Sequence, residues 1–201
     1  MNRVPDPSPS PIRDQLLDAA YALVAESGWA KLRMTHIATA AGVPRAVVHE
    51  HFGSLDAVGQ ALVSREADRF LLGIVAELRK HPDDLGRSTA AGVGFALHLA
   101  ASNPLLASIL TSSVGEDRIL VAHITTRSEQ IFDSAYTLIA DYVEKAWPMI
   151  PDERRRLMVD AVVRMTISHI VAPALPPEQA ARDIADIAVH VAGTRGYSDS
   201  A

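Results

Sequence analysis

The chain has 201 residues, a formal net charge of −5 and no cysteine. The lack of cysteine excludes a disulfide framework, a thiol nucleophile and a thiolate metal site, and the negative charge argues against a protein that coats nucleic acid without specificity. Hydrophobic residues make up 48% of the chain and aromatic residues only 5%. This composition is typical of helices that pack through Ala, Leu, Val and Ile.

No apolar run approaches the roughly 20 residues that span a bilayer, and residues 1–10 lack the apolar core of a secretion signal. We therefore expect a cytoplasmic protein without a membrane-spanning segment. Residues 1–10 are rich in proline and poor in apolar side chains, which predicts a disordered tail.

The spacing of apolar residues predicts helices throughout, with no strand-like alternation. Three short helices are expected first, over residues 11–27, 34–41 and 45–51. A longer helix should begin after Ser54, which suits the N-cap position, and should end at His81-Pro82. Further helices are predicted over 85–101, 103–111, 117–146, 153–171 and 177–193, with a break at 112–115. The predicted fold class is all-α.

Two of these later helices carry their own boundary signals. Asp152 is expected to cap the helix over 153–171, and Gly193 is expected to end the helix over 177–193. Small residues in the last helix permit close approach of another helix. They are Ala180, Ala181 and Ala185.

The segment from Met34 to Phe52 has the features of a helix-turn-helix. Gly42 can adopt a left-handed conformation without the steric penalty of a Cβ atom, so it can end one helix and redirect the chain. Pro44, with its fixed φ, suits the first turn of the next helix. In this plan the second helix enters the major groove of DNA. The residues expected to pack between the helices are Ile37, Val43, Val48 and Phe52, with Ala38 and Ala41 allowing close approach.

At these residues the chain resembles the TetR/AcrR family of transcriptional regulators. The matching stretches are DAAYALVAESGWAKLRM and IATAAGVPRAVVHEHFGSLDAVGQAL. The resemblance implies an N-terminal three-helix helix-turn-helix DNA-binding domain over 11–54. It also implies a larger C-terminal helical bundle over 55–201 for ligand binding and dimerisation. The implied partners are a palindromic double-stranded DNA operator, a small-molecule effector and a second copy of the chain, paired through the last two helices. In that pairing Ala180, Ala181 and Ala185 would permit close approach of the partner's helices.

The expected base-reading residues lie at the start of the recognition helix. They are Arg45, Ala46, His49 and Glu50. Arg45 is suited to bind guanine O6 and N7 in a bidentate manner, and Glu50 is suited to accept from cytosine N4. By resemblance, Thr35, His36 and His51 would contact phosphates or line the edge of the groove.

The resemblance also implies a ligand pocket among the C-terminal helices. The residues predicted to line it are Phe95, His98, Phe132 and Tyr136.

These features predict a ligand-responsive transcriptional repressor that a small molecule releases from its operator. Several positions depart from the family pattern: His49, Val47 and Leu55 stand where Tyr, Thr and Lys are usual, and Glu50 is acidic. They leave open the alternative of a TetR-fold sensor or protein-interaction dimer with a degenerate DNA-binding surface.

An enzyme is not expected, and no catalytic residue, metal site or cofactor is predicted. The chain contains no Glu-x-x-His pair, Gly-rich phosphate loop or Gly-x-Ser-x-Gly elbow.

Overall fold

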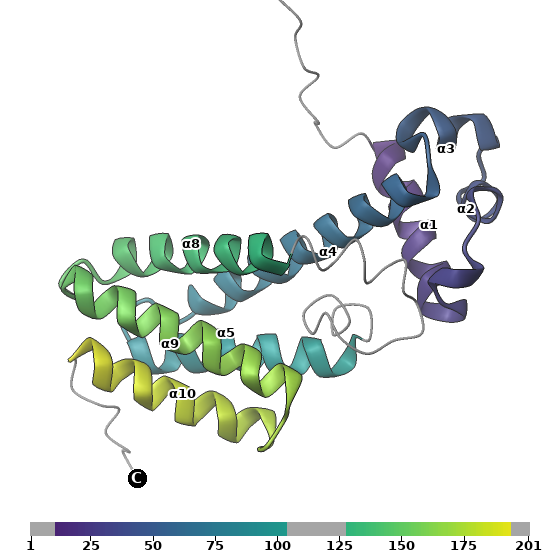
Figure 1. Ribbon diagram of the computed structural model, residues 1–201. Coiled ribbons are helices and arrows are strands. Elements are labelled where there is room, and N and C mark those ends of the chain that lie inside the picture. Colours follow the sequence, from purple (N-terminus) through teal and green to yellow (C-terminus); the bar gives the residue numbers. More distant parts are fainter. Residues whose placement is uncertain (1–10, 104–127, 194–201) are drawn as a thin grey trace, which may run out of the picture. The chain divides into compact units, whose positions relative to one another are not determined.

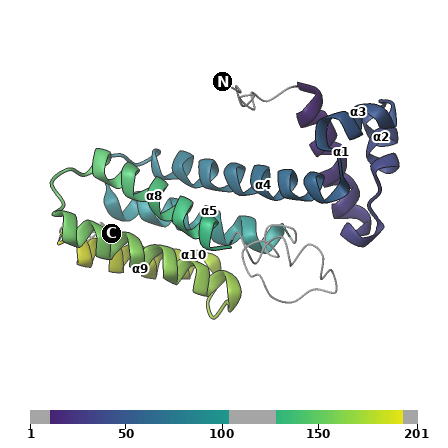
Figure 2. The ribbon, with the colours of Figure 1, turned by 45° about the horizontal axis from the view of Figure 1, so that its top comes forward.

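The computed structural model describes residues 11–103 and 128–193, with the backbone alone for residues 128–132. The described residues form eight α-helices and one short 3-10 helix and contain no strand, which confirms the all-α prediction for that part of the chain (Figures 1 and 2). Some predictions lie outside the described residues: the tail at 1–10, the short helix to 111, the break at 112–115 and the start of the helix over 117–146.

Packing divides the described residues into two compact units, with the division after Arg65. The first unit contains α1 (Pro11–Ser27), the 3-10 helix (Trp29–Lys31), α2 (Met34–Ala41), α3 (Arg45–Phe52) and the first half of α4 (Leu55–Leu78). The second contains the rest of α4, α5 (Leu85–Ser102), α8 (Ser128–Ala146), α9 (Asp152–Val171) and α10 (Pro177–Ala192). The functional domains predicted over 11–54 and 55–201 stay a prediction, because compactness does not report on function.

The turn between α2 and α3 has the predicted geometry. Gly42 lies in the left-handed region, with φ 67° and ψ 30°. The Val43 N–H then donates to the Ala38 carbonyl over 3.0 Å, which closes the end of α2. Pro44 differs slightly from expectation, because it occupies the N-cap position of α3, with an extended ψ of 145°, and the helix begins at Arg45.

The first unit is held together by contacts of α1 with the helix-turn-helix. Leu16 and Leu17 of α1 are fully buried, as are Ile37 of α2 and Val48 of α3. Burial of each such side chain stabilises the fold by roughly 1.5–3 kcal/mol. The Gln15 side-chain amide of α1 donates to the Ala41 carbonyl over 2.9 Å, so the last turn of α2 gains a partner that α2 cannot supply.

Helix α4 begins as predicted and ends earlier than predicted. The Ser54 hydroxyl accepts from the Ala57 N–H over 3.1 Å, which confirms Ser54 as a capping residue. The helix ends at Leu78, before His81. The Leu78 carbonyl accepts from the Ser88 hydroxyl over 2.8 Å and from the Tyr142 hydroxyl over 2.9 Å. Side chains of α5 and α8 therefore satisfy this carbonyl at the end of the helix.

The second unit is a bundle in which α10 packs most extensively against α5, and α9 contacts α10, α8 and α5. Helix α10 ends at Gly193, as predicted, with φ 73°. The prediction for Asp152 was wrong, because Pro151 occupies the N-cap position of α9 and makes no side-chain capping bond. Asp152 is the first helical residue, and its carboxylate accepts from Arg155 one turn later, over 2.5 Å.

We predict that Gly42→Ala lowers the free energy of unfolding by about 1–2 kcal/mol, because a Cβ atom is disfavoured in the left-handed region. A Cβ atom added there meets nothing within 4 Å. The loss of stability therefore reports only the strain of a left-handed backbone with a side chain. The control is Gly94→Ala within α5, where the added methyl group lies 3.8 Å from Ala181 Cβ, an ordinary contact. The control should gain about 0.5–1 kcal/mol from helix propensity. Urea unfolding measures both; equal effects of the two substitutions would contradict the assignment of the left-handed turn.

Candidate nucleic-acid interface and apolar cavity

Helix α3 has one buried and one exposed side. Val48 and Phe52, one helical turn apart, are buried against the first unit. The exposed side carries the residues predicted to read bases, namely Arg45, Ala46, His49 and Glu50. Their spacing of one and four residues places them on one face of the helix. The structure therefore brings these four side chains together on the surface, as a groove-reading helix requires.

Other predicted DNA contacts lie on the neighbouring surface of the same unit. Thr35 and His36, in the first turn of α2, are exposed, and His51 is half-buried. Arg33 occupies the N-cap position of α2 without a side-chain capping bond; its guanidinium instead donates to the Ala30 and Leu32 carbonyls over 2.8 and 2.7 Å. The positive end of α2 therefore lacks a side-chain cap, which suits it to an anion such as a phosphate group.

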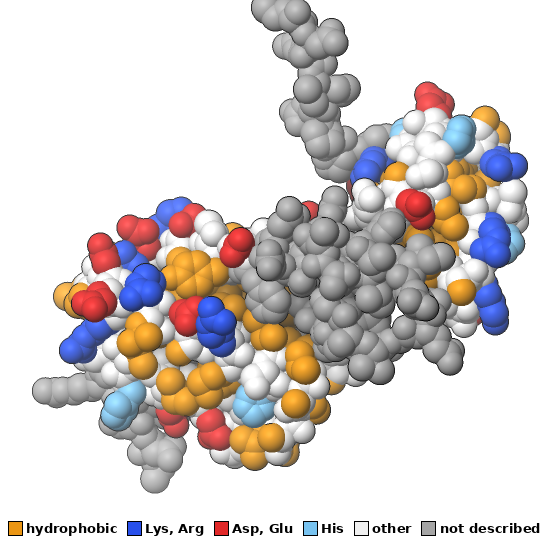
Figure 3. Space-filling model, viewed as in Figure 1, with side chains coloured by type: hydrophobic (Ala, Val, Ile, Leu, Met, Phe, Trp, Pro, Cys, Tyr) orange, Lys and Arg blue, Asp and Glu red, His pale blue; other side chains and the backbone are white. Residues whose placement is uncertain are grey.

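The charge on this surface is mixed. Lys31, Arg33 and Arg45 are exposed basic residues of the helix-turn-helix region, and Glu50 is an exposed acidic one. Figure 3 shows Lys or Arg and His side chains at the surface of this unit. Arg13 of α1 is placed differently, with its guanidinium carbon 4.9 Å from the centre of the Phe52 ring. This cation–π contact joins α1 to α3 and covers the recognition helix on its protein side.

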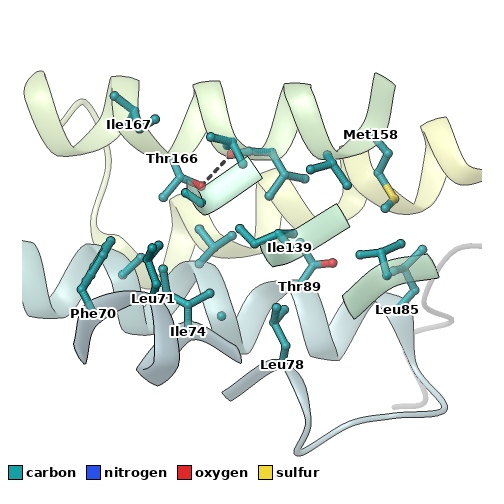
Figure 4. Close-up of a pocket in the computed structure, with 18 of the residues that line it drawn as sticks. Phe70, Leu71, Ile74, Leu78, Leu85, Thr89, Ile139, Met158, Thr166 and Ile167 are labelled. Atoms are coloured by element: carbon teal, nitrogen blue, oxygen red, sulfur yellow. Dashed lines mark hydrogen bonds between the residues drawn. The ribbon is translucent and has the colours of Figure 1, made fainter. Parts of the chain in front are cut away.

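The second unit contains an apolar cavity of about 80 Å³. It lies between α4 and α5 on one side and α8 and α9 on the other (Figure 4). Leu71, Ile74 and Leu78 of α4 face Met158 and Ile167 of α9 across it. A concave, mostly apolar space with few polar groups is the usual form of a small-molecule site.

Three of the residues predicted to line a pocket, Phe95, His98 and Tyr136, do not line this cavity. The Phe95 ring fills the space above Gly73, where an added Cβ atom would lie 2.4 Å from it. His98 is exposed, and Tyr136 packs beside the cluster that contains Val143 and Met158. The side chain of Phe132 lies outside the described residues. A ligand role for the four residues stays a prediction, and the cavity lining gives it no support at Phe95, His98 or Tyr136.

Sequence reasoning missed the lining residues of α4 and α9. The prediction relied on aromatic residues of α5 and α8, whereas the cavity is lined mainly by aliphatic side chains. A usable signal was present in the two threonines that interrupt apolar helix faces, Thr89 and Thr166, both of which line the cavity.

His98 instead joins α5 to α10. Its Nδ1 lies 2.8 Å from the Gly94 carbonyl and its Nε2 lies 2.9 Å from Glu178 Oε1. Both nitrogens therefore face acceptors, which favours the imidazolium. The pKa of His98 is raised, first by the Gly94 carbonyl and then by the bond to Glu178. The pKa of Glu178 is lowered, first by its own backbone N–H and then by His98.

Within residues 11–103 and 128–193, no group of three or more His, Asp or Glu side chains is arranged to hold a metal ion. None of the helices in these ranges combines the length and apolarity needed to cross a membrane.

Two family models match the chain. Residues 16–62 match the model described as bacterial regulatory proteins of the tetR family. Residues 84–190 match the model of the C-terminal domain of the bacterial tetracycline repressor. The first match covers the helix-turn-helix, and the second covers every helix that lines the cavity except α4.

The chain is also similar to individual regulators. It is 27% identical over 185 residues to the HTH-type transcriptional regulator AlkX of Mycobacterium tuberculosis, which covers 92% of this chain and 87% of AlkX. Over 128 residues it is 27% identical to the HTH-type transcriptional activator FasR of Mycolicibacterium smegmatis, covering 64% of this chain and 58% of FasR.

Among solved structures, the TetR family repressor AlkX of Dietzia sp., implicated in biodegradation of n-alkanes, has a TM-score of 0.68 at 23% identity, covering 89% of this chain and 96% of that one. FadR of Bacillus subtilis in complex with stearoyl-CoA has a TM-score of 0.53 at 17% identity, and the match covers 88% of this chain and 97% of FadR. At these identities the two structures support the fold.

We predict that the His98–Glu178 pair stabilises the protein only within a pH window. The raised pKa of His98 means that its contribution is complete below the ordinary pKa of histidine and is lost as pH rises through the raised value. The lowered pKa of Glu178 means that its contribution is present above the ordinary carboxyl pKa and is lost as pH falls through the lowered value. Both contributions are therefore complete between the ordinary pKa of a glutamate carboxyl group and the ordinary pKa of histidine.

A double-mutant cycle with His98→Gln and Glu178→Gln tests this window. Thermal unfolding should show a favourable coupling at about pH 5.5 and none at about pH 8.5. A coupling that persists unchanged at the higher pH would contradict an imidazolium–carboxylate pair.

Proposed function

The chain belongs to the TetR family of bacterial transcriptional regulators, and from this premise we propose that it is a ligand-responsive repressor. In this proposal a dimer binds a palindromic operator through α3 of each subunit, and a small molecule in the apolar cavity releases it. The observation that carries the proposal is the exposed face of α3, where Arg45 and His49 project one turn apart while the opposite face is buried.

The roles proposed for single residues follow from their chemistry and exposure. Arg45 offers two parallel donors to a guanine edge, whereas the Glu50 carboxylate can only accept, as from cytosine N4. Thr35 and His36 lie at the uncapped start of α2, so we assign them to phosphate contacts, which set the register of the module on the duplex.

A dimer is proposed because one eight-residue recognition helix reads too few bases for useful specificity. The last two helices carry exposed apolar residues for this purpose. On α9, Leu157 and Val171 are 53% and 52% exposed, and their separation of fourteen residues returns to nearly the same helix face. On α10, Ile187 is 37% exposed. Figure 3 shows hydrophobic side chains over these helices, interspersed with charged ones.

The proposed interface differs in one respect from the sequence-based expectation. Ala180, Ala181 and Ala185 are buried within the subunit, and Ala180 and Ala181 belong to a cluster with Val93 and Leu97 of α5. These alanines therefore permit close approach of α10 to its own α5. The exposed apolar residues are the ones available to a partner.

Release by a ligand requires that the ligand bind one conformational state more tightly than the other. Helix α4 is the proposed link, because Ile74 and Leu78 near its end line the cavity while residues 55–65 belong to the helix-turn-helix unit. The relatives support a hydrocarbon-related effector, since AlkX of Dietzia is implicated in n-alkane biodegradation and FadR holds stearoyl-CoA.

The second candidate is a sensor or interaction dimer that keeps the TetR fold without binding DNA. The observation that favours it is the acidic Glu50, exposed on the recognition face, which repels phosphate groups. Equal affinity for DNA from beside its own gene and for scrambled DNA of the same length would favour this candidate over the repressor.

We predict that Arg45→Ala weakens specific DNA binding by about 1–3 kcal/mol, because a bidentate guanine contact is lost. The control is Arg79→Ala, an exposed arginine after the end of α4, which removes the same charge outside the helix-turn-helix and should change affinity little. Gel shifts with DNA from beside the gene measure both variants. Equal losses would indicate a general charge effect and contradict base reading by Arg45.

We predict that Ile187→Arg shifts the protein from dimer to monomer, because a charge placed in the proposed apolar interface must be desolvated. Leu72→Arg is the control, since Leu72 is also an exposed apolar residue, at 64%, but lies on α4. Size-exclusion chromatography with light scattering gives the mass of each variant. Retention of the dimer by Ile187→Arg would place the interface elsewhere.

A further inference from the structure

The apolar cavity of the second unit is large enough for an organic molecule. Its volume of about 80 Å³ is several times the roughly 10–15 Å³ of cavity that a single water molecule needs. The lining side chains are aliphatic or aromatic except for those of Thr89 and Thr166 and the indole N–H of Trp147. Water in such a space has few partners, so an apolar ligand that displaces it gains free energy.

The two threonine hydroxyls differ in what they already bind. Thr166 donates to the Val162 carbonyl in the preceding turn of α9, over 2.7 Å, as the dashed line in Figure 4 shows. Thr89, on α5, is only 6% exposed, yet its hydroxyl makes no hydrogen bond to any of the described residues. A helical threonine commonly satisfies its hydroxyl on the preceding turn. The Thr89 hydroxyl therefore remains available to a ligand.

The charge of the ligand is restricted by the same lining. No Lys, Arg, His, Asp or Glu side chain belongs to the described lining. Burying a carboxylate or phosphate without a cation or several donors costs far more than burying a hydroxyl that finds one partner. The lining therefore disfavours an ionised group buried among these side chains and accepts a neutral one.

We propose that this cavity binds an uncharged, mainly hydrocarbon molecule carrying one hydroxyl or carbonyl group, and that Thr89 holds that group by a hydrogen bond. The inference rests on the proposed function in that it names the chemical class of the effector. The proposal predicts a neutral alcohol or ketone as the ligand. A carboxylate or an acyl-CoA would be excluded, because each carries a charged group beside its hydrocarbon chain.

The test uses three probes of equal chain length: 1-octanol, n-octane and sodium octanoate. Trp147 lines the cavity and is one of only two tryptophans in the chain, so its emission reports binding to the full-length protein. We expect 1-octanol to bind more tightly than n-octane by about 3- to 10-fold, the value of one hydrogen bond. Octanoate at pH 8 should bind at least about tenfold more weakly than 1-octanol.

Thr89→Val tests the hydroxyl with almost no change in shape. This substitution should weaken the binding of 1-octanol by about 3- to 10-fold and leave the affinity for n-octane unchanged. Thr166→Val is the matched control: it removes a hydroxyl from the same cavity, but one already bonded within the helix, so the preference for 1-octanol over n-octane should persist. Urea unfolding of both variants shows whether each is folded before binding is compared.

The outcomes separate this proposal from the proposed function. Octanoate binding as tightly as 1-octanol, or an equal loss of 1-octanol binding in the two variants, overturns the assignment of the cavity. A gel shift with operator DNA in the presence of 1-octanol measures DNA release independently of the binding assay. Binding of 1-octanol that depends on Thr89, with no effect on operator binding, supports the cavity assignment and overturns ligand-driven release.

Discussion

The left-handed turn at Gly42 fixes which side of α3 faces the protein. Because α3 has only eight residues, it makes about two turns, and a helix of that length is not stable alone. It persists because Val48 and Phe52 are buried with Ile37 of α2, and that burial requires the chain to reverse at Gly42. The exposed residues on the opposite side of α3 are then fixed as well. The proposed DNA-binding surface is thus a consequence of backbone geometry and packing.

The second unit depends on a different arrangement, in which several polar groups at or beside the cavity are bonded within the protein, while the Thr89 hydroxyl lines the cavity without such a bond to any described residue. The Leu78 carbonyl accepts from Ser88 and Tyr142, and Thr166 is satisfied on its own helix. What remains between the helices is almost entirely apolar. In the proposed function, a ligand would change the balance between conformations through shape, the burial of apolar surface and the Thr89 hydroxyl, and α4 presents part of the surface that it would contact.

Much of the fold could be predicted from the sequence because its boundaries follow local rules. A capping hydroxyl at Ser54 and a left-handed residue at Gly42 act within a few residues of themselves. The cavity could not be predicted in the same way, since its lining depends on which residue another helix places opposite. Phe95 illustrates this, because its ring occupies the space left by the missing side chain of Gly73. Asp152 shows that even a local rule fails when the preceding Pro151 takes the N-cap position.

The small residues of α10 have a consequence for how this protein can change over time. Ala180, Ala181 and Ala185 are buried within the subunit, on the helix that packs against α5. Alanine can lose only its methyl group, and any larger side chain must force the two helices apart. Substitutions at these positions are therefore tolerated in one direction only, and a paralogue that diverges in effector or operator is expected to keep this contact while the α3 surface and the cavity lining vary around it.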